Sequence, residues 1–523
     1  MNNLINLFDS VSEKIHKNQK ITIVKGLNLY TEYPATLLID IAIKFTCFLK
    51  SQSIVHRDKI LLIPNNSISS ISIFLGASKI GVITCFVPIK LNVSEITSLV
   101  RSTKCKLVMC SASYRYRHEL YTAITGICKV IEYSDFDFSC RCVDMNILQN
   151  LSNTSESIYF DSKSPISILF TSGSTNSPTG VILSQESYLL NAIQIGKHIN
   201  ISEKDKYLQV LPFYYIAGQI TSVLTPLLFG ADLIITNDMN PSVILFCILL
   251  LGPTITNLVP TLLYRLNDYI IKKEIILNSK NHKLRLCLAG GADCSQTIID
   301  ILLSYDILVV QGYGSTEAGC GICINNIEAP RTGSVGIPLD GHEIKILKDD
   351  DIICDVEEIG ELLIKNNVSM IEYYEDKIRT REVLYDGWYK TRDLGYKDQD
   401  GYIYICGRKS DLIKRGGEKI YLSEIENILF KNIYIKECKV LSISDLELGE
   451  LPIACVVMRD DKHRPDLMNW IKTNFSKYKT PKIIFMDEIP STSSGKVAIS
   501  EIKRQIELGN ISYVEGGNYE KHY

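Results

Sequence analysis

The chain has 523 residues, of which 46% are apolar and 22% charged, and its formal net charge is −3. This composition is typical of a globular protein with more than one domain and excludes a disordered or fibrous chain. The nearly balanced charge gives no electrostatic basis for binding nucleic acid or an anionic membrane surface, so neither is an expected partner.

The N-terminal residues 1–17 mix acidic and basic side chains without an unbroken apolar core, so we expect no signal peptide. The longest apolar run, residues 243–251, is less than half a membrane span and predicts a buried core element. Sixteen cysteines without an export signal predict mostly free thiols in a reducing, cytoplasmic compartment.

Two cysteine pairs, Cys140/Cys142 and Cys320/Cys323, raise the alternative of a metal site. A zinc site needs a second pair at ligand spacing or nearby histidines, and neither pair has that support. We interpret both as structural or incidental thiols.

Short apolar strands alternate with helical segments up to about residue 400, which is typical of a layered α/β protein. Buried strands are expected at residues 166–170, 180–184, 286–292 and 307–314. Glycines or small residues follow several of these strands, and such strand ends are where α/β sheets place their ligands.

Between the first two strands lies TSGSTNSPTG (171–180), with six hydroxyl side chains, two glycines and no charge. Its backbone N–H groups could point inward as an anion nest. It is not a Walker A loop, because GK[ST] is absent and the following segment reads as a strand. Taken alone, the stretch fits a plain surface loop at least as well.

Four more motifs follow in order: YGSTE (313–317), YKTRD (389–393), GRKSDLIKRGGEKI (407–420) and PSTSSGKV (490–497). With the 171–180 loop they resemble, in order and separation, the motifs of the adenylate-forming superfamily of acyl-CoA synthetases, luciferases and peptide-synthetase adenylation domains. The resemblance covers about residues 20 to 500. It implies an α/β fold with a large N-terminal domain of several subdomains, 1–408, and a small mobile α+β domain, 409–523.

The resemblance implies that the 171–180 loop clasps the β- and γ-phosphates of ATP. The residues concerned are Thr171, Ser172, Gly173, Ser174 and Thr175.

Two positions of this loop depart from the family pattern. Asn176 replaces a glycine and Thr179 replaces a lysine. The lost lysine removes one charge-assisted contact, worth about 1.5–3 kcal/mol. We therefore expect Thr179→Lys to lower the KM for ATP or to raise the adenylation rate.

In YGSTE, the resemblance places Tyr313 against the adenine, with Gly314 beside it in the ATP site. It places Thr316 near the α-phosphate and makes Glu317 a ligand of Mg²⁺, the expected cofactor. Thr316 and Glu317 are thus candidate catalytic residues.

Asp393 and Arg408 match the two residues with which the family grips the ribose. Arg392 stands where the family has glycine, and it either crowds the site or adds a cation. The hinge between the domains is expected at Ser410 or Asp411.

Lys496 aligns with the lysine that bridges the carboxylate and the α-phosphate during adenylation, where a fixed ammonium stabilises the spreading charge. Gly417 matches the loop that lines the tunnel for the phosphopantetheine arm. Lys414, Arg415 and Lys419 are candidates for binding the CoA 3′-phosphate.

For the acid pocket, LPFYYIAG (211–218) resembles the family motif that gates the acid site, with Tyr215 at the gating position. No acidic residue lies between Leu211 and Ile220, which disfavours an α-amino acid. Small residues point to an open apolar channel for an alkyl or aryl acid, or alternatively to close backbone packing; they are Gly290, Gly291, Ala318 and Gly319.

These residues imply an enzyme that joins a small carboxylic acid to a thiol. ATP and the acid give acyl-AMP and pyrophosphate, and the acyl group then passes to CoA. The alternatives are a stand-alone ligase that loads a carrier protein, and a non-catalytic scaffold, because four family positions are altered. Against a scaffold, the four residues of the expected chemistry are all present: Glu317, Asp393, Arg408 and Lys496.

Overall fold

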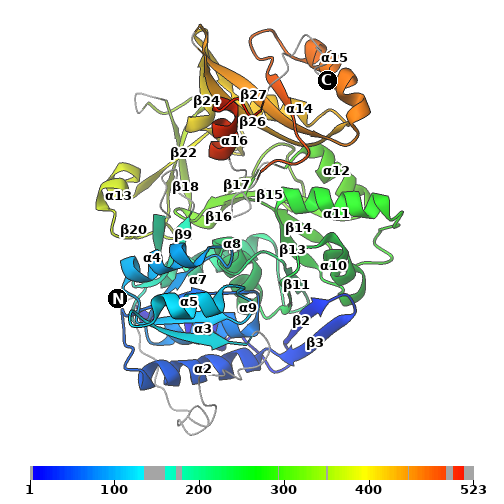
Figure 1. Cartoon of the computed structure of the whole chain (residues 1–523). Helices are drawn as coiled ribbons and strands as arrows, with labels where there is room; N and C mark the ends of the chain where they lie inside the picture. Colours follow the sequence, from blue (N-terminus) through cyan, green and yellow to red (C-terminus); the bar gives the residue numbers. More distant parts are fainter. Residues whose placement is uncertain are drawn as a thin grey trace. The chain divides into compact units, whose positions relative to one another are not determined.

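The computed structural model describes residues 4–134, 160–171, 179–292, 294–348, 352–445, 447–490 and 499–511. The chain forms two compact units (Figure 1). The first unit comprises Met1–Ile344 and Ile364–Tyr389, and the second comprises Lys345–Leu363 and Lys390–Tyr523. A mixed α/β architecture with a large first unit and a smaller second one confirms the predicted fold class. The domain boundary expected between residues 408 and 409, and the hinge expected at Ser410 or Asp411, stay predictions.

A nine-stranded sheet of the first unit has the order β17-β16-β15-β14-β13-β11-β12-β2-β3. The six central strands, from β15 to β2 in this order, pair in parallel. Antiparallel strands complete both edges of the sheet: β16 and β17 beside β15, and β3 beside β2. The bounds are β2 Lys20–Gly26, β3 Leu29–Pro34, β11 Lys206–Gln209, β12 Asp232–Thr236, β13 Ile255–Leu258, β14 Leu286–Ala289, β15 Leu308–Ser315, β16 Gly319–Ile324 and β17 Ile337–Pro338. The strands expected at 286–292 and 307–314 are thus confirmed, the first over its opening four residues.

A seven-stranded sheet of the same unit has the order β20-β10-β9-β5-β4-β6-β7. Its bounds are β4 Lys59–Ile63, β5 Ile83–Phe86, β6 Leu107–Ser111, β7 Lys129–Tyr133, β9 Pro165–Thr171, β10 Thr179–Ser184 and β20 Glu372–Tyr373. The predicted strands on either side of the 171–180 loop are β9 and β10, which pair antiparallel. A short pair, β1 Leu4–Ile5 and β8 Phe160–Asp161, forms a separate sheet.

The helices of the first unit pack against these sheets. They are α1 Leu7–Ser12, α2 Thr36–Ser51, α3 Ile68–Lys79, α4 Val93–Thr103, α5 Arg117–Ile124, α7 Gln185–His198, α8 Ile216–Gln219, η1 Ile220–Leu224, α9 Thr225–Leu228, α10 Pro241–Phe246, η2 Cys247–Leu251, α11 Pro260–Lys272, α12 Gln296–Ser304 and α13 Lys377–Val383. Helix α3 is buried along its whole length, and a Cβ at Gly76 would lie 2.4 Å from the Ala42 carbonyl oxygen of α2. Glycine therefore allows the two helices to approach closely.

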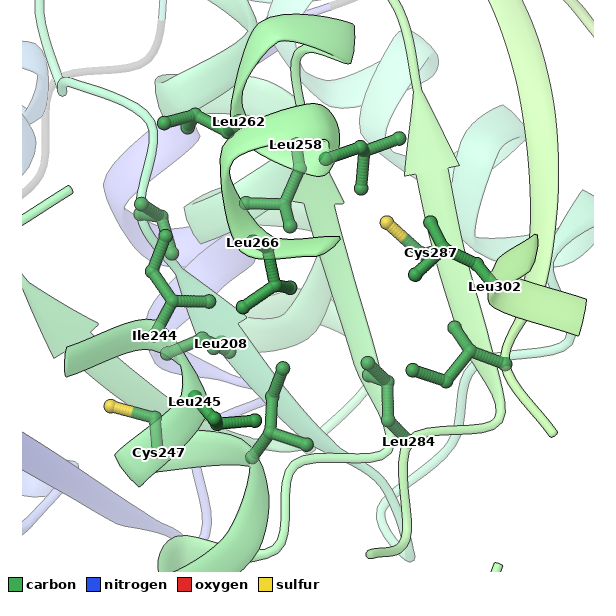
Figure 2. Packing of buried hydrophobic residues seen from close by; sticks show 14 of the residues in the cluster. Leu208, Ile244, Leu245, Cys247, Leu258, Leu262, Leu266, Leu284, Cys287 and Leu302 are labelled. Atoms are coloured by element: carbon green, nitrogen blue, oxygen red, sulfur yellow. The ribbon is translucent and has the colours of Figure 1, made fainter. Parts of the chain in front are cut away.

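Figure 2 shows part of an apolar cluster of the first unit, where leucines of α11 meet residues of α10 and of strands β13 and β14. The apolar run 243–251 contributes to this core: residues 243–248 are buried, as predicted, whereas Leu250 near its end is 67% exposed. The helix ends at Gly252, whose φ of +64° suits glycine. Among the described residues, no helix combines the length and the apolar character needed to cross a membrane.

The second unit contains a sheet of order β25-β24-β27-β26, with β28 beside β27, that packs against helices α14 and α15 around its own apolar core. The bounds are β24 Leu412–Arg415, β25 Glu418–Tyr421, α14 Leu422–Leu429, β26 Ile435–Asp445, β27 Gly449–Met458, α15 Arg464–Asn474, β28 Lys482–Phe485 and α16 Ile499–Glu507. The helix expected to begin near Ser423 is α14.

Another sheet has the order β18-β19-β22-β21, with β23 beside β22. Its bounds are β18 Glu343–Leu347, β19 Gly360–Lys365, β21 Leu384–Tyr385, β22 Trp388–Lys397 and β23 Ile403–Arg408. Short 3₁₀ turns, Lys409–Asp411 and Asp461–His463, complete the unit.

Candidate active site

The YGSTE motif lies at the tip of the antiparallel hairpin β15–β16. The register pairs Ser315 with Gly319, so Thr316, Glu317 and Ala318 form the turn. The Ser315 hydroxyl accepts the N–H of Ala318 at 3.0 Å and closes this turn. A Cβ at Gly314 would lie 1.9 Å from the Cys320 carbonyl oxygen, so only glycine permits the two strands to approach here. The hairpin holds Tyr313, Thr316 and Glu317 half-buried.

A second segment, residues 366–374, fixes the turn from outside. The Met370 N–H donates to the Glu317 carbonyl oxygen at 2.7 Å, and the Asn366 amide donates to the Ala318 carbonyl oxygen at 2.9 Å. The Tyr373 hydroxyl donates to Glu317 Oε1 at 3.2 Å. Both the backbone and the carboxylate of Glu317 are therefore held, which keeps its ionised oxygens in a fixed direction.

Tyrosines surround this carboxylate. Burial, and then the nearby charge of Glu317, raises the pKa of Tyr373 to about 12. The same two causes, with Tyr373 and Tyr313 close by, raise the pKa of Tyr389 far above its ordinary value. Both phenols stay protonated at neutral pH, so the Tyr373 hydroxyl acts as a hydrogen-bond donor to Glu317.

His342 is 8% exposed and belongs to a neutral hydrogen-bond network behind the hairpin. Its Nε2 lies 3.1 Å from Gln194 Oε1, and its Nδ1 lies 3.1 Å from the Asn366 side-chain nitrogen. Asn366 can only donate in this contact, so Nδ1 accepts and Nε2 carries the proton. Burial lowers the pKa of His342 to about 4. Through Asn366 the neutral imidazole supports the turn that carries Glu317.

We expect the stability of the protein to fall as the pH drops from about 6.5 to 4. The folded pKa of His342 lies below its unfolded value, so its contribution is complete above pH 6.5 and is lost toward pH 4. The loss reaches up to about 3 kcal/mol. Urea unfolding at pH 7 and pH 4.5 measures it. His342→Gln should show a shallower pH dependence, while His118→Gln, at an exposed position, should behave as wild type; equal slopes in all three would contradict the assignment.

The 171–180 loop connects β9 to β10, and the structure describes its two ends. The side chain of Thr171 and residues 172–178, which include Ser172, Gly173, Ser174, Thr175 and Asn176, lie outside the described part. At the other end, Arg379 Nη1 donates to the Thr179 hydroxyl oxygen at 2.6 Å. Gly180 packs against Ile168, Phe170 and Tyr374, and a Cβ there would lie 2.9–3.1 Å from their atoms.

Mg²⁺ binds through one or two carboxylates, with water and phosphate oxygens completing its shell. Glu317 offers one half-buried carboxylate, which fits that donor set. Within the described ranges, no group of three or more His, Cys, Asp or Glu side chains is arranged to hold a metal alone. The Glu317 site thus fits a metal that is shared with a phosphate ligand.

The paired cysteines give no metal site where they are described. Cys320 and Cys323 are three apart on strand β16, so their side chains point to opposite faces. Cys320 Sγ lies 3.1 Å from the Thr221 hydroxyl, and burial raises the pKa of Cys320 to about 11. Cys140 and Cys142 lie outside the described residues. The described cysteines are free thiols.

The residues expected in the acid pocket fall into two groups. Ala318 is fully buried, and a Cβ at Gly319 would lie 2.7 Å from Val368, which corresponds to close packing. Gly290 and Gly291 follow β14, and a Cβ at either would meet nothing closer than 3.4 Å. Packing is therefore tight at Gly319 and looser at Gly290 and Gly291, where an added Cβ would make only ordinary van der Waals contacts.

Tyr215 precedes α8 and is half-buried against Tyr214, with ring centroids 4.5 Å apart. Burial raises the pKa of the Tyr215 hydroxyl, which stays protonated at neutral pH. Gly218 allows the first turn of the helix to pack on the preceding loop, because a Cβ there would lie 2.2 Å from the Pro212 carbonyl oxygen.

In the second unit, the β22–β23 ladder places Asp393 directly opposite Arg408. Arg408 Nε lies 3.3 Å from Asp393 Oδ1, and the two side chains are 67% and 13% exposed. The carboxylate is sheltered and the guanidinium open to solvent, which suits a pair that receives a ligand from the solvent side. The structure brings together the two residues expected to hold the ribose.

Arg392 has a φ of +63°, the left-handed conformation that favours glycine. This backbone geometry explains why a glycine suits the position. The Arg392 N–H donates to Glu361 Oε1 at 3.2 Å, so a carboxylate holds the unusual backbone of this residue in place.

Gly417 and Gly416 form the two-residue turn of the β24–β25 hairpin, with φ values of +91° and +58°. Positive φ at both central residues is the type I′ pattern of tight hairpins. Arg415, one of the candidate CoA-binding cations, donates to the Tyr478 carbonyl oxygen at 2.7 Å and to that of Thr480 at 3.1 Å. It therefore serves the fold of the second unit. Lys496 lies outside the described residues.

Sequence reasoning missed the segment 366–379, from which Asn366, Met370, Tyr373 and Arg379 contact the YGSTE turn and the end of the 171–180 loop. The one signal in the sequence is the basic run KIRTR (377–381) just before the YKTRD motif. His342 was also missed, and a lone histidine carries no pattern that would identify it.

Comparison with known proteins matches residues 40–374 to the AMP-binding enzyme family, and residues 424–496 to the AMP-binding enzyme C-terminal domain. A 2-succinylbenzoate–CoA ligase of Bacillus cytotoxicus is 30% identical over 346 residues, which are 65% of this chain and 70% of the ligase.

Two solved structures share the fold. ATP-bound MatB from Rhodopseudomonas palustris has a TM-score of 0.87 at 21% identity, covering 96% of this chain and 99% of MatB. An o-succinylbenzoate CoA synthetase from Bacillus subtilis, in complex with its acyl-adenylate intermediate, has a TM-score of 0.81 at 23% identity, covering 95% and 98% of the two chains.

Proposed function

The chain belongs to the AMP-binding enzyme family, and from this premise we propose that it is an AMP-forming ligase that joins an aryl carboxylic acid to the thiol of CoA. The observation that supports this most is the convergence on one segment, 366–379, of Glu317 from the YGSTE turn and Thr179 from the end of the 171–180 loop. Two motifs that are 138 positions apart in the chain, 179 and 317, thereby share one support, as a single ATP site requires.

In the first half-reaction a carboxylate oxygen of the acid attacks the α-phosphorus of ATP, and pyrophosphate leaves. Glu317 would hold Mg²⁺, which offsets phosphate charge when bound. Lys496 is proposed to place its ammonium between the carboxylate and the α-phosphate, with Thr316 beside that phosphate. Tyr313 would cover the adenine, and Asp393 with Arg408 would accept and donate hydrogen bonds to the ribose hydroxyls.

In the second half-reaction the CoA sulfur attacks the acyl carbon and AMP leaves with the electron pair of the broken bond. No side chain is acylated. We propose that the C-terminal domain expected at residues 409–523 pivots near Ser410 or Asp411 between the two steps, and that the Gly417 turn then takes part in thiol binding. The free thiols of the described cysteines support a reducing, cytoplasmic setting.

An aryl acid is favoured on two grounds. The similar proteins are named as 2-succinylbenzoate–CoA ligases, and CoA is the acceptor in those names, which supports CoA over a carrier protein. In addition, the segment around Tyr215 carries no carboxylate that would bind an α-amino group.

Pyrophosphate release with a panel of aryl, alkyl and amino acids tests this function. We expect release with an aryl acid, and an aryl-CoA thioester when CoA is added. The same assay with a phosphopantetheinylated carrier protein in place of CoA provides the comparison. Thioester formation on the carrier protein alone would overturn the assignment of CoA as the acceptor. No pyrophosphate release with any acid would favour a non-catalytic scaffold.

A further inference from the structure

The Thr179 side chain, which stands in place of the family's loop lysine, is in contact with a cation from another part of the first unit. Arg379 Nη1 donates to Thr179 Oγ1 at 2.6 Å across 200 residues of sequence. Arg379 lies on α13, which Figure 1 shows beside β20, and it is half-buried. A guanidinium therefore sits at the position where the loop lacks its own charge.

Several contacts determine this placement. Strand β20 pairs with β10 so that Tyr373 lies opposite Val181, and the Tyr374 N–H donates to the Gly180 carbonyl oxygen at 2.7 Å. Asp376 caps α13 by accepting the N–H of Arg379 at 3.0 Å. Helix α13 is thereby attached to β10, the strand that begins at Thr179. The Arg379 guanidinium is therefore held in place more firmly than that of an ordinary surface arginine.

The surroundings leave the charge of Arg379 available. Its guanidinium carbon lies 4.9 Å from the centre of the Tyr373 ring, a cation–π contact that orients the group. Tyr373 contacts both charged groups, since its ring faces the guanidinium and its hydroxyl donates to Glu317. Within the described part of the chain, Arg379 forms no ion pair with a carboxylate. A half-buried cation without a carboxylate partner is suited to an anionic ligand.

We propose that Arg379 supplies the positive charge for the β- and γ-phosphates of ATP that Thr179 cannot supply. The inference rests on the proposed function, because the family resemblance assigns those phosphates to the 171–180 loop. Arginine offers a planar pair of N–H donors, which suits phosphate oxygens. Helix α13, and not the loop, thus supplies the cation, and the Thr179 hydroxyl positions it.

This arrangement changes what Thr179→Lys should do. In the wild type a lysine at 179 would place an ammonium beside the guanidinium of Arg379, so the gain expected from the sequence disappears. In a chain without Arg379, the same lysine would restore the missing charge. If Thr179→Lys improves ATP binding only in the chain that lacks Arg379, the two residues share one role; equal effects in both chains would mean that they act independently.

The test combines equilibrium binding of ATP and AMP by calorimetry with the ATP dependence of pyrophosphate release. The variants are Arg379→Ala, Arg379→Gln, Thr179→Lys and Thr179→Lys with Arg379→Ala. Arg381→Ala is the matched control, because Arg381 lies exposed on the same helix. Arg379→Gln keeps an N–H donor for Thr179 but no charge, so it separates charge from local structure.

We expect Arg379→Ala and Arg379→Gln to weaken ATP binding about 10- to 100-fold, the value of one charge-assisted contact, and to leave AMP binding within about twofold. Thr179→Lys should restore ATP binding in the Arg379→Ala chain. Unchanged ATP binding, equal losses for ATP and AMP, or no rescue would each overturn the proposal. Calorimetry measures binding without turnover. A chain that releases no pyrophosphate would refute the proposed function, and the comparison of ATP binding with AMP binding would still test the role of Arg379.

Discussion

Lys496→Ala is expected to abolish acyl-AMP formation while thioester formation from preformed acyl-AMP continues. The first half-reaction brings a carboxylate toward a triphosphate, two anions, and a fixed ammonium between them stabilises the transition state. Loss of one such cation in phosphoryl-group chemistry costs about 1,000-fold or more. In the second half-reaction a thiol attacks an acyl-AMP, and the repulsion between carboxylate and triphosphate is no longer present.

The two half-reactions are measured separately, by pyrophosphate release and by consumption of synthetic acyl-AMP with CoA. Lys503→Ala provides the control, because Lys503 lies on α16 a few residues further along the same unit. That variant should retain both activities. Equal losses of both half-reactions in Lys496→Ala would show that the lysine does not act selectively in adenylation.

Glu317→Gln is expected to have the second largest effect. The substitution keeps the shape of the side chain, and its amide oxygen can still accept from the Tyr373 hydroxyl. The negative charge that Mg²⁺ needs is lost. We expect the Mg²⁺ concentration for half-maximal adenylation to rise at least about 10- to 100-fold, since even partners that only support a metal ligand have effects of that size.

A titration of pyrophosphate release with Mg²⁺ at saturating ATP measures this shift. Glu328→Gln carries the same chemical change at an exposed position of the same unit and should titrate as wild type. Saturating Mg²⁺ should recover part of the activity of Glu317→Gln. An unchanged Mg²⁺ midpoint would mean that Glu317 does not bind the metal, and its hydrogen bond to Tyr373 would then be purely structural.

The strands and turns of the site could be predicted because their signals are local. Apolar runs predicted β9 and β10 on either side of the 171–180 loop. Antiparallel pairing in the β22–β23 ladder then puts Asp393 opposite Arg408, two residues that the motifs had already singled out.

Local patterns also left questions open that only the structure could address. Small residues at four positions fitted either an open channel or close packing. The structure separates them: Ala318 and Gly319 are closely packed, whereas an added Cβ at Gly290 or Gly291 would make only ordinary van der Waals contacts. The difference lies in what each Cβ would meet, and those neighbours come from other segments of the chain.

The sequence by itself determined the family, the mixed α/β architecture and the identity of the residues that carry the expected chemistry, because motif order and strand periodicity are properties of the chain. The tertiary structure decided which residues support them. The two-residue strand β20 has no sequence signature, yet its pairing with β10 brings Arg379 to Thr179 and Tyr373 to Glu317. Contacts that span 200 and 56 residues depend on that pairing, so the position of the missing positive charge is visible only in the folded chain.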